Sequence, residues 1–352
     1  MTQDWIPDSD NYSNNYSDFK TCDNIKDVYP DRTDAFHVQL ILGFLYLIVC
    51  IFGVSGNILV IYVALCEKIS FTVRTVFIVN LACSDLTTGL TSLPITAIST
   101  IFTREWVFGW IVCYFIGFLQ GCSIFASSFT LISIAVDRYY LIAQPHITRV
   151  TYRRACIAVS AFWITASILS SPMIVFMKVV TYARVCGEFC EEQWPSQTDR
   201  RIYGILVPVV QFGLPVACTS ACYLMISSRL GEQIRARQSQ QQMLPERERR
   251  LIHRRRRTNR MMAAMVTMFV LMWLPFNFVN LARDLKFDSY ILKSDDFNLT
   301  FAICHLVAMT STMTNPVIYS FFNESFRSAI KKMFWGRNWP INSRTGAAGI
   351  RL

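Results

Sequence analysis

Residues 38–66 read VQLILGFLYLIVCIFGVSGNILVIYVALC, a stretch that contains no charged side chain. A helix needs about 20 consecutive apolar residues to cross the hydrocarbon core of a bilayer. The chain of 352 residues is 53% hydrophobic and 16% charged, whereas roughly a quarter of the residues in a soluble domain are charged. The stretch and the composition together predict a membrane protein and argue against a water-soluble enzyme.

Further apolar runs of similar length follow the first one. They cover residues 72–102, 110–142, 152–177, 200–228, 258–285 and 296–321. Several of them contain proline well inside the run, namely Pro94, Pro172, Pro208, Pro215, Pro275 and Pro316. Membrane helices tolerate such prolines because neighbouring helices and waters satisfy the freed carbonyl groups. We therefore expect an all-α membrane protein, a bundle of seven transmembrane helices that spans residues 38–321.

Charge is distributed unevenly between the segments that join these runs. Residues 1–36 carry a net charge of −5, whereas residues 229–260 carry +8 and residues 324–352 carry +5. The positive-inside rule then makes residues 1–37 an extracellular segment and residues 336–352 a cytoplasmic tail. We expect a multi-pass protein of the plasma membrane, whose net charge of +10 needs no nucleic-acid partner.

Short Asn-x-Ser/Thr sequences, which accept N-linked glycans, lie on both predicted sides of the membrane. Asn11, Asn15 and Asn298 lie on the predicted outer side and are the expected glycosylation sites. A fourth such sequence begins at Asn323, on the predicted inner side, where we expect no glycan.

Four of the twelve cysteines, Cys22, Cys113, Cys186 and Cys190, lie on the predicted outer side of the membrane, where disulfides persist. Cys113 begins the third run, and either Cys186 or Cys190 in the following outer loop is a suitable partner for it. The loop cysteine that remains has Cys22 as its outer partner. Either pairing lays this loop across the outer mouth of the bundle.

Asp85 is the acid that lies deepest in an apolar run, and an ionisable residue inside the membrane is a functional candidate by default. Polar side chains occur at comparable depth in other runs, namely Asn57, Ser127, Trp273, Thr312 and Asn315. Oxygen ligands around one carboxylate suit a hard cation such as sodium, for which Asp85, Ser127 and Asn315 are the candidate ligands. The alternative is a carboxyl group hydrogen-bonded to structural water without an ion.

Residues 322–335 show helical spacing of apolar and basic side chains. Phe322, Phe326 and Ile330 recur on one face with Met333 and Phe334, while Arg327, Lys331 and Lys332 take the other. This pattern predicts an amphipathic helix on the inner leaflet, in contact with membrane lipid. The basic run Arg254–Arg257 has two open interpretations, a contact with anionic lipid or a contact with a G protein.

Other classes of membrane protein fit the sequence less well. A transporter or channel usually shows an internal repeat or several ionisable residues along a path, and neither is visible here. An intramembrane enzyme needs a nucleophile with a base, or a metal site, at membrane depth. The histidines are scattered, at positions 37, 146, 253 and 305, so we expect neither an enzyme nor a cofactor.

Motifs spread over almost the whole chain resemble those of the rhodopsin-like G-protein-coupled receptors. In chain order they are Gly56-Asn57-Ile58-Leu59-Val60, Leu81-Ala82-Cys83-Ser84-Asp85, Asp137-Arg138-Tyr139, Trp163, Pro215 with Tyr223, Trp273-Leu274-Pro275-Phe276 and Asn315-Pro316-Val317-Ile318-Tyr319. A single triplet is weak support, but the full set occurs in the right runs and in the right order.

This resemblance implies a function in signalling. The expected partners are a heterotrimeric G protein, with the inhibitory class implied, and arrestin. The expected activation switch comprises Asp137, Arg138, Tyr139, Tyr223, Phe269, Trp273, Pro275, Asn315, Pro316 and Tyr319. In physical terms, Arg138 can pair with the neighbouring Asp137 at rest, and Pro275 provides a bend in the sixth span.

Within the family, the ligand class follows from a few positions. Amine receptors place an Asp where this chain has Gln120, and opsins need a Lys in the seventh span, where this chain has none. The closest resemblance is to the neuropeptide Y and neuropeptide F receptors. It is carried by Gln120, Gln211, Asn280, Asp284, His305, the stretch Trp106–Gly109 and the stretch Cys190–Pro195.

An amidated peptide ligand with a terminal Arg-aromatic pair is what that resemblance implies. Asp284 is the expected partner of the ligand arginine, with Asn280 one turn below it. The alternative for Asp284 is a surface salt bridge to Arg283 or Lys286. The amide and imidazole groups of Gln120, Gln211 and His305 would meet the carboxamide, and Glu191 and Trp194 complete the expected site. Receptors for other peptides, tachykinin-like or RYamide-like, are the alternative.

The resemblance also selects one disulfide pairing. Cys190 directly precedes the family-like Glu-x-x-Trp-Pro stretch. We therefore expect Cys113 to be bonded to Cys190, and Cys22 to Cys186.

Overall fold

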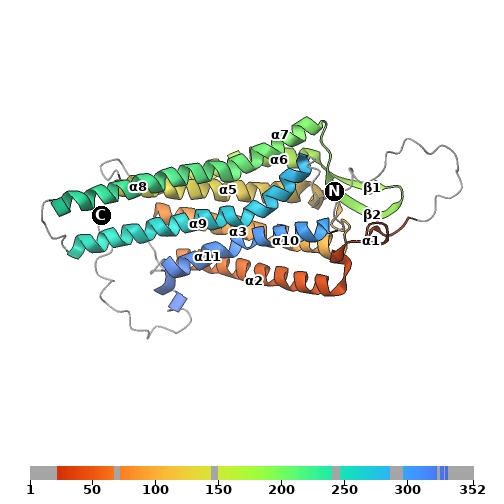
Figure 1. The fold of residues 1–352 in the computed structure, drawn as a ribbon, viewed down its shortest axis with the longest axis horizontal. Helices are drawn as coiled ribbons and strands as arrows, with labels where there is room; N and C mark the ends of the chain where they lie inside the picture. The colour runs from red at the N-terminus through yellow and green to blue at the C-terminus, as the bar shows by residue number, and fades with distance from the viewer. Residues whose placement is uncertain are drawn as a thin grey trace.

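The computed structural model describes residues 22–66, 72–143, 150–239, 246–285, 296–322, 326–328 and 330–331. Seven helical spans in these ranges are long and apolar enough to cross a membrane, and they lie side by side as a bundle (Figure 1). The predicted fold class is thereby confirmed. The expected glycosylation sites Asn11 and Asn15 lie outside the described residues, and Asn298 lies at the start of the seventh span.

Four of the seven spans each lie within one helix, and the other three contain a break. Three of the four are α2 (Phe36–Cys66), α5 (Gly109–Ala143) and α6 (Tyr152–Phe176). The sixth span, Asn259–Asp284, is the C-terminal part of one long helix, α9 (Glu246–Asp284). The others are α3 (Val73–Leu90), α4 (Ser92–Thr96) and η3 (Ala97–Phe102) for the second, α7 (Gln197–Pro208), η4 (Val209–Gly213) and α8 (Leu214–Ser239) for the fifth, and α10 (Phe297–Met309) and α11 (Ser311–Phe322) for the seventh.

Two prolines each leave a backbone carbonyl without its helical donor, and a side chain of a neighbouring span donates to that carbonyl instead. Because proline has no N–H, the carbonyl four residues before it loses its helical donor. Pro215 frees the carbonyl of Gln211, which accepts a hydrogen bond from Ser128 Oγ at 2.7 Å. Pro316 frees the carbonyl of Thr312, which accepts one from Asn57 Nδ2 at 2.8 Å. Side chains of neighbouring spans thus replace the missing donors.

Further buried polar groups join the spans to one another. Asn80 of α3 accepts a hydrogen bond from Trp163 Nε1 of α6 at 2.8 Å and donates one to Thr130 Oγ1 of α5 at 2.7 Å. Asn315 of α11 donates to Asp85 of α3 at 2.9 Å. Asn80, Thr130, Asp85 and Asn315 are buried and Trp163 is half-buried, so the bonds specify which helices are neighbours.

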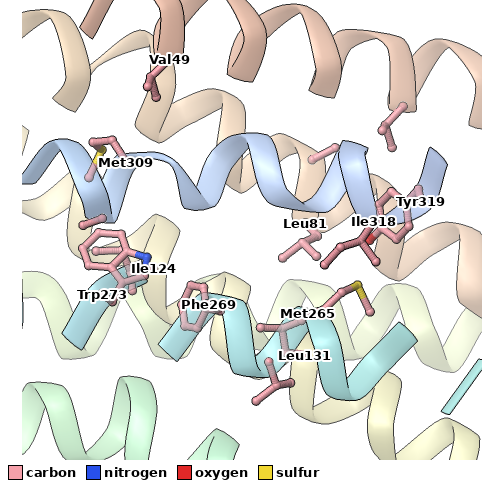
Figure 2. Packing of buried hydrophobic residues seen from close by; sticks show 14 of the residues in the cluster. Val49, Leu81, Ile124, Leu131, Met265, Phe269, Trp273, Met309, Ile318 and Tyr319 are labelled. Carbon is pink, nitrogen blue, oxygen red and sulfur yellow. The ribbon is translucent and has the colours of Figure 1, made fainter. Parts of the chain in front are cut away.

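Apolar side chains fill the interior between these polar contacts. Trp273 and Phe269 of α9, Leu131 of α5 and Tyr319 of α11 are all less than a tenth exposed and belong to one cluster. Figure 2 shows this cluster extending along the bundle between Met309 and Tyr319. The spans therefore share one continuous core.

A β-hairpin and residues 22–35, called the N-terminal segment from here on, cover one end of the bundle (Figure 1). Strands β1 (Met177–Tyr182) and β2 (Val185–Glu192) pair antiparallel. Cys190 of β2 is bonded to Cys113 at the start of α5, and Cys186 is bonded to Cys22, which is the pairing that the resemblance implied. The short helices α1 (Ile25–Val28) and η2 (Arg32–Asp34) follow Cys22, so the second disulfide holds the N-terminal segment against the hairpin.

The expected amphipathic helix at residues 322–335 is described only in part. Residues 326–328 and 330–331 are helical. Phe326 is buried against Tyr319, whereas Arg327 and Lys331 are exposed. Lys332, Met333 and Phe334 lie outside the described residues. The contact of this helix with lipid stays a prediction.

Candidate ligand-binding site

A cavity of about 1030 Å³ opens among the spans at the end covered by the hairpin. It is at the upper end of the range for small-molecule sites, which is roughly 300–1,000 Å³. Six of the seven residues expected to bind ligand line it, namely Gln120, Gln211, Asn280, Asp284, His305 and Glu191. The seventh, Trp194, does not belong to the lining.

Asp284, the last residue of α9, is already paired with an arginine of the protein itself. Its Oδ1 lies 3.1 Å from Arg200 Nε of α7 and 3.7 Å from Arg283 Nε. The carboxylate is 10% exposed, and a buried charge of this kind needs a partner. The sequence suggested Arg283 or Lys286 as competing partners. It missed Arg200, because nothing in the sequence places α7 beside the end of α9, and Lys286 lies outside the described residues.

The acids of the hairpin are engaged as well. Buried Glu191 accepts a hydrogen bond from the hydroxyl of Tyr182 at 2.7 Å. Glu192 accepts one from Trp194 Nε1 at 2.9 Å and lies 3.8 Å from Arg283. Trp194 packs against the rings of Phe176 and Tyr203, with centroid distances of 4.2 and 5.2 Å. Trp194 thus links the end of β2 to α6 and α7.

His305 lies deep in the cavity wall with both ring nitrogens satisfied. The Tyr46 hydroxyl donates to the Ala302 carbonyl at 2.9 Å and lies 3.0 Å from His305 Nδ1. Since the hydroxyl has one hydrogen, Nδ1 carries the proton and donates to Tyr46, and Nε2 is left to accept from Ser92 Oγ at 3.4 Å. The imidazole thus offers the cavity an aromatic ring rather than free nitrogens, which differs from the role expected for it.

The side-chain amides that line the cavity differ in whether they already make a hydrogen bond within the protein. Asn280 Nδ2 donates to the Phe276 carbonyl at 3.0 Å. Within the described part of the chain, the side chains of Gln120 and Gln211 make no hydrogen bond, although both residues line the cavity. Gln211 lies in the π-helical segment η4, and Ser128 Oγ fixes its backbone by donating a hydrogen bond to its carbonyl. These two amides are the groups best placed to meet a polar ligand end.

The expected sodium ligands are only partly brought together. Asn315 Nδ2 donates to Asp85 Oδ2 at 2.9 Å, and both side chains are buried. Ser127 is buried too, but among the described residues it has no hydrogen bond to either. The hydroxyl of Tyr319 and Oδ1 of Asn57 are buried without a partner in the same described set. Oxygen atoms thus remain available near the centre of the bundle, as a small hydrated cation requires.

The expected switch residues occupy the core and the end of the bundle opposite the hairpin. Arg138 Nη2 lies 3.0 Å from Asp137 Oδ2, the local pair that the sequence indicated. Trp273 lines the cavity, packs against Phe269 and donates from Nε1 to Ser311 Oγ at 3.1 Å. The other members are Tyr139 beside Tyr140, Pro275 inside α9, half-exposed Tyr223, and buried Asn315, Pro316 and Tyr319. Their role in activation stays a prediction.

The N-terminal segment is part of the cavity wall, which the sequence did not reveal. Tyr29 and Asp31 line the cavity. Arg104 holds this segment, because its guanidinium donates to the Tyr29 carbonyl and to Asp34 Oδ2, both at 2.7 Å. Packing of Ile25 against β2 adds an apolar contact. The disulfide to Cys22 was the one available signal that this segment folds back over the bundle.

Comparison with known proteins identifies the family. Residues 56–319 match the family described as 7 transmembrane receptor (rhodopsin family). The chain is 44% identical over 314 residues to neuropeptide receptor 3 of Caenorhabditis elegans, across 87% of this chain and 82% of that receptor. It is 30% identical over 312 residues to neuropeptide Y receptor type 2 of Macaca mulatta (86% and 78% of the two chains) and 31% identical over 325 residues to neuropeptide F receptor of Drosophila melanogaster (87% and 65%). The expected resemblance is confirmed, and the family is one of receptors, not enzymes.

The bonds of Tyr46 predict a measurable loss of stability. Tyr46→Phe leaves the Ala302 carbonyl and His305 Nδ1 without their partner, and we expect a cost of about 1 to 2 kcal/mol. The measurement is the fraction of detergent-solubilised protein that stays monodisperse after heating. Tyr62→Phe is the matched control, since Tyr62 lies on the same helix with half of its surface exposed. Equal behaviour of the two variants would show that the network around His305 contributes no stability.

Proposed function

The chain belongs to the rhodopsin family of seven-transmembrane receptors, and we propose that its ligand is an amidated neuropeptide with a C-terminal Arg-aromatic pair. The observation that carries the proposal is the composition of the cavity. Carboxylates lie at its rim and two unengaged amides lie deeper, at Gln120 and Gln211. The relatives named for neuropeptides Y and F support the same ligand class.

The cavity matches such a peptide end in two respects. A carboxamide has both a donor and an acceptor, and each glutamine side chain offers the complementary pair. Aromatic rings of Trp273, Phe276 and Phe301 line the same wall and can receive an aromatic side chain. A free carboxylate would meet only neutral amides there, so the amide form is favoured.

Signalling follows from the orientation that the charge distribution predicts. In our proposal the hairpin end faces the outside of the plasma membrane, and the basic ends of α8 and α9 face the cytoplasm. Release of Arg138 from Asp137 would expose a cation to a heterotrimeric G protein, of the inhibitory class by analogy with the family. Arrestin and inner-leaflet lipid are the further partners we propose.

A panel of amidated octapeptides tests this function. Cells that express the full chain are exposed to peptides ending in Arg-Phe-amide or Arg-Tyr-amide, to their free acids, and to amidated peptides without the Arg-aromatic pair. Nucleotide exchange is then measured on inhibitory and stimulatory G proteins. We expect the amidated Arg-aromatic peptides to be at least tenfold more potent than their free acids. Activation by the third group alone would favour the tachykinin-like alternative.

Asp284 is the proposed partner of the ligand arginine, and Arg200 competes for it. A partly desolvated charge pair is worth roughly 2 to 5 kcal/mol when one partner is removed. Asp284→Ala should therefore weaken an Arg-aromatic peptide by about thirtyfold or more, since 1.4 kcal/mol corresponds to tenfold. Arg200→Gln should strengthen peptide binding, because the carboxylate of Asp284 is then no longer paired with Arg200.

The control for this pair is Asp199→Ala, which removes an exposed acid of α7 outside the cavity lining. Surface expression is measured for every variant. If Asp284→Ala lowers expression without changing potency, and Arg200→Gln brings no gain, the Asp284–Arg200 pair is structural and the ligand arginine binds elsewhere.

Sodium is proposed to bind at Asp85 with Ser127 and Asn315 in the resting receptor. An ion that favours the resting state must weaken agonist binding by linkage. Agonist potency in membranes should thus fall as sodium replaces choline at constant ionic strength, and Asp85→Asn should abolish this dependence. An undiminished sodium effect in Asp85→Asn would place the ion elsewhere.

A further inference from the structure

Five carboxylates line the cavity, and four of them have partners within the protein. Asp31 accepts from the backbone N–H groups of Thr33 and Asn298, while the pairs of Glu191, Glu192 and Asp284 are described above. Glu105 is the fifth. Across all residues that the structure describes, its carboxylate has neither a hydrogen bond nor an ion pair.

The backbone around Glu105 is held on both sides. Thr103 Oγ1 donates to the Glu105 carbonyl at 2.8 Å, and the N–H of Trp106 donates to the Glu188 carbonyl of β2 at 2.7 Å. Arg104, the preceding residue, has a φ of 58°, which non-glycine residues rarely adopt. Its buried guanidinium pairs with Asp34, so this conformation is fixed by the N-terminal segment.

The hairpin leaves room for the carboxylate of Glu105 at one position. Gly187 of β2 has a φ of 104°, and a methyl group on it would lie 2.6 Å from Cδ of Glu105. The side chain of Glu105 therefore lies against the bare backbone of the hairpin. An acid held in this way loses little conformational entropy when it binds a cation.

We propose that Glu105 binds a second cationic side chain of the peptide, an arginine or lysine other than the one next to the terminal aromatic residue. This inference rests on the proposed function and adds a specificity determinant to it. The three arginines that line the cavity, Arg104, Arg200 and Arg283, all have carboxylate partners. Glu105 is thus an acid that a ligand cation neutralises without breaking an existing pair.

Glu105 and Asp284 lie on different walls of the cavity. Glu105 belongs to the loop between the second and third spans, and Asp284 ends α9. A cation at Asp284 must compete with Arg200 at 3.1 Å, whereas no described residue competes at Glu105. A peptide with two separated basic residues therefore gains more from Glu105 than a peptide with one.

A series of amidated octapeptides tests the inference on the full-length receptor in cells. Each peptide ends in Arg-Phe-amide, and a second arginine replaces alanine at one of the earlier positions. A parallel series carries citrulline, the neutral isostere of arginine, at the same positions. In the unmodified receptor we expect arginine to be at least tenfold more potent than citrulline at one position. In Glu105→Gln that advantage should shrink to less than threefold.

Glu188→Gln is the matched control, because Glu188 is an exposed acid one residue beyond Gly187 and does not line the cavity. It should keep the full advantage of arginine. If Glu105→Gln fails to reach the surface, Glu105→Asp takes its place, since the shorter side chain should cut the advantage at least threefold. An advantage that persists in the tested Glu105 variant would overturn the inference.

The outcomes separate the two proposals. Should no peptide of the series activate the unmodified receptor, the proposed function is wrong and the inference falls with it. Should the series activate the receptor with equal potency for arginine and citrulline at every position, the proposed function stands and the role of Glu105 alone is wrong.

Discussion

A backbone carbonyl in hydrocarbon has no water to bind, so every one that proline frees must find a donor within the protein. Much of this structure depends on that constraint. Ser128 serves the carbonyl that Pro215 frees, and Asn57 serves the one that Pro316 frees. Both donors come from a neighbouring span, so each repair also fixes the position of one helix against another. Asn57, a polar residue of the family motifs, therefore has a structural role in this bundle.

The same irregular segments shape the cavity. The second span changes to a π-helix at Ala97–Phe102 and the fifth at Val209–Gly213, both at the end that the hairpin covers. A π-turn widens the helix and changes the direction of the side chains beyond it. Gln211 lies in one such turn, buried, with its amide directed at no group of the described chain. At Gln211, therefore, the backbone carbonyl is the one that Pro215 frees, and the side-chain amide lines the cavity.

Hydropathy located the spans because the bilayer imposes their minimum length. The third span, expected at residues 110–142, is α5 at Gly109–Ala143. The sixth span, expected at residues 258–285, is Asn259–Asp284, although the helix that contains it, α9, already begins at Glu246. Helix formation continues past the membrane wherever propensity allows, and apolar content does not report it. The resemblance selected residues that do line the cavity, such as Gln120 and Asp284. Arg200, Glu105 and the N-terminal wall depend on contacts between distant segments, which no local pattern encodes.

Charge pairing at the rim determines how this cavity can discriminate between ligands. An anionic ligand would have to separate a base such as Arg200 from its carboxylate, and breaking a desolvated pair leaves a buried charge without compensation. A neutral ligand leaves every pair intact and gains only from burial of its apolar surface. A cationic ligand can exchange with a base of the receptor or bind an acid that has none. In our proposal, charge at the rim would exclude one set of competing ligands and hydrogen bonding at the deep amides would exclude another, so that each level adds to the specificity of the cavity.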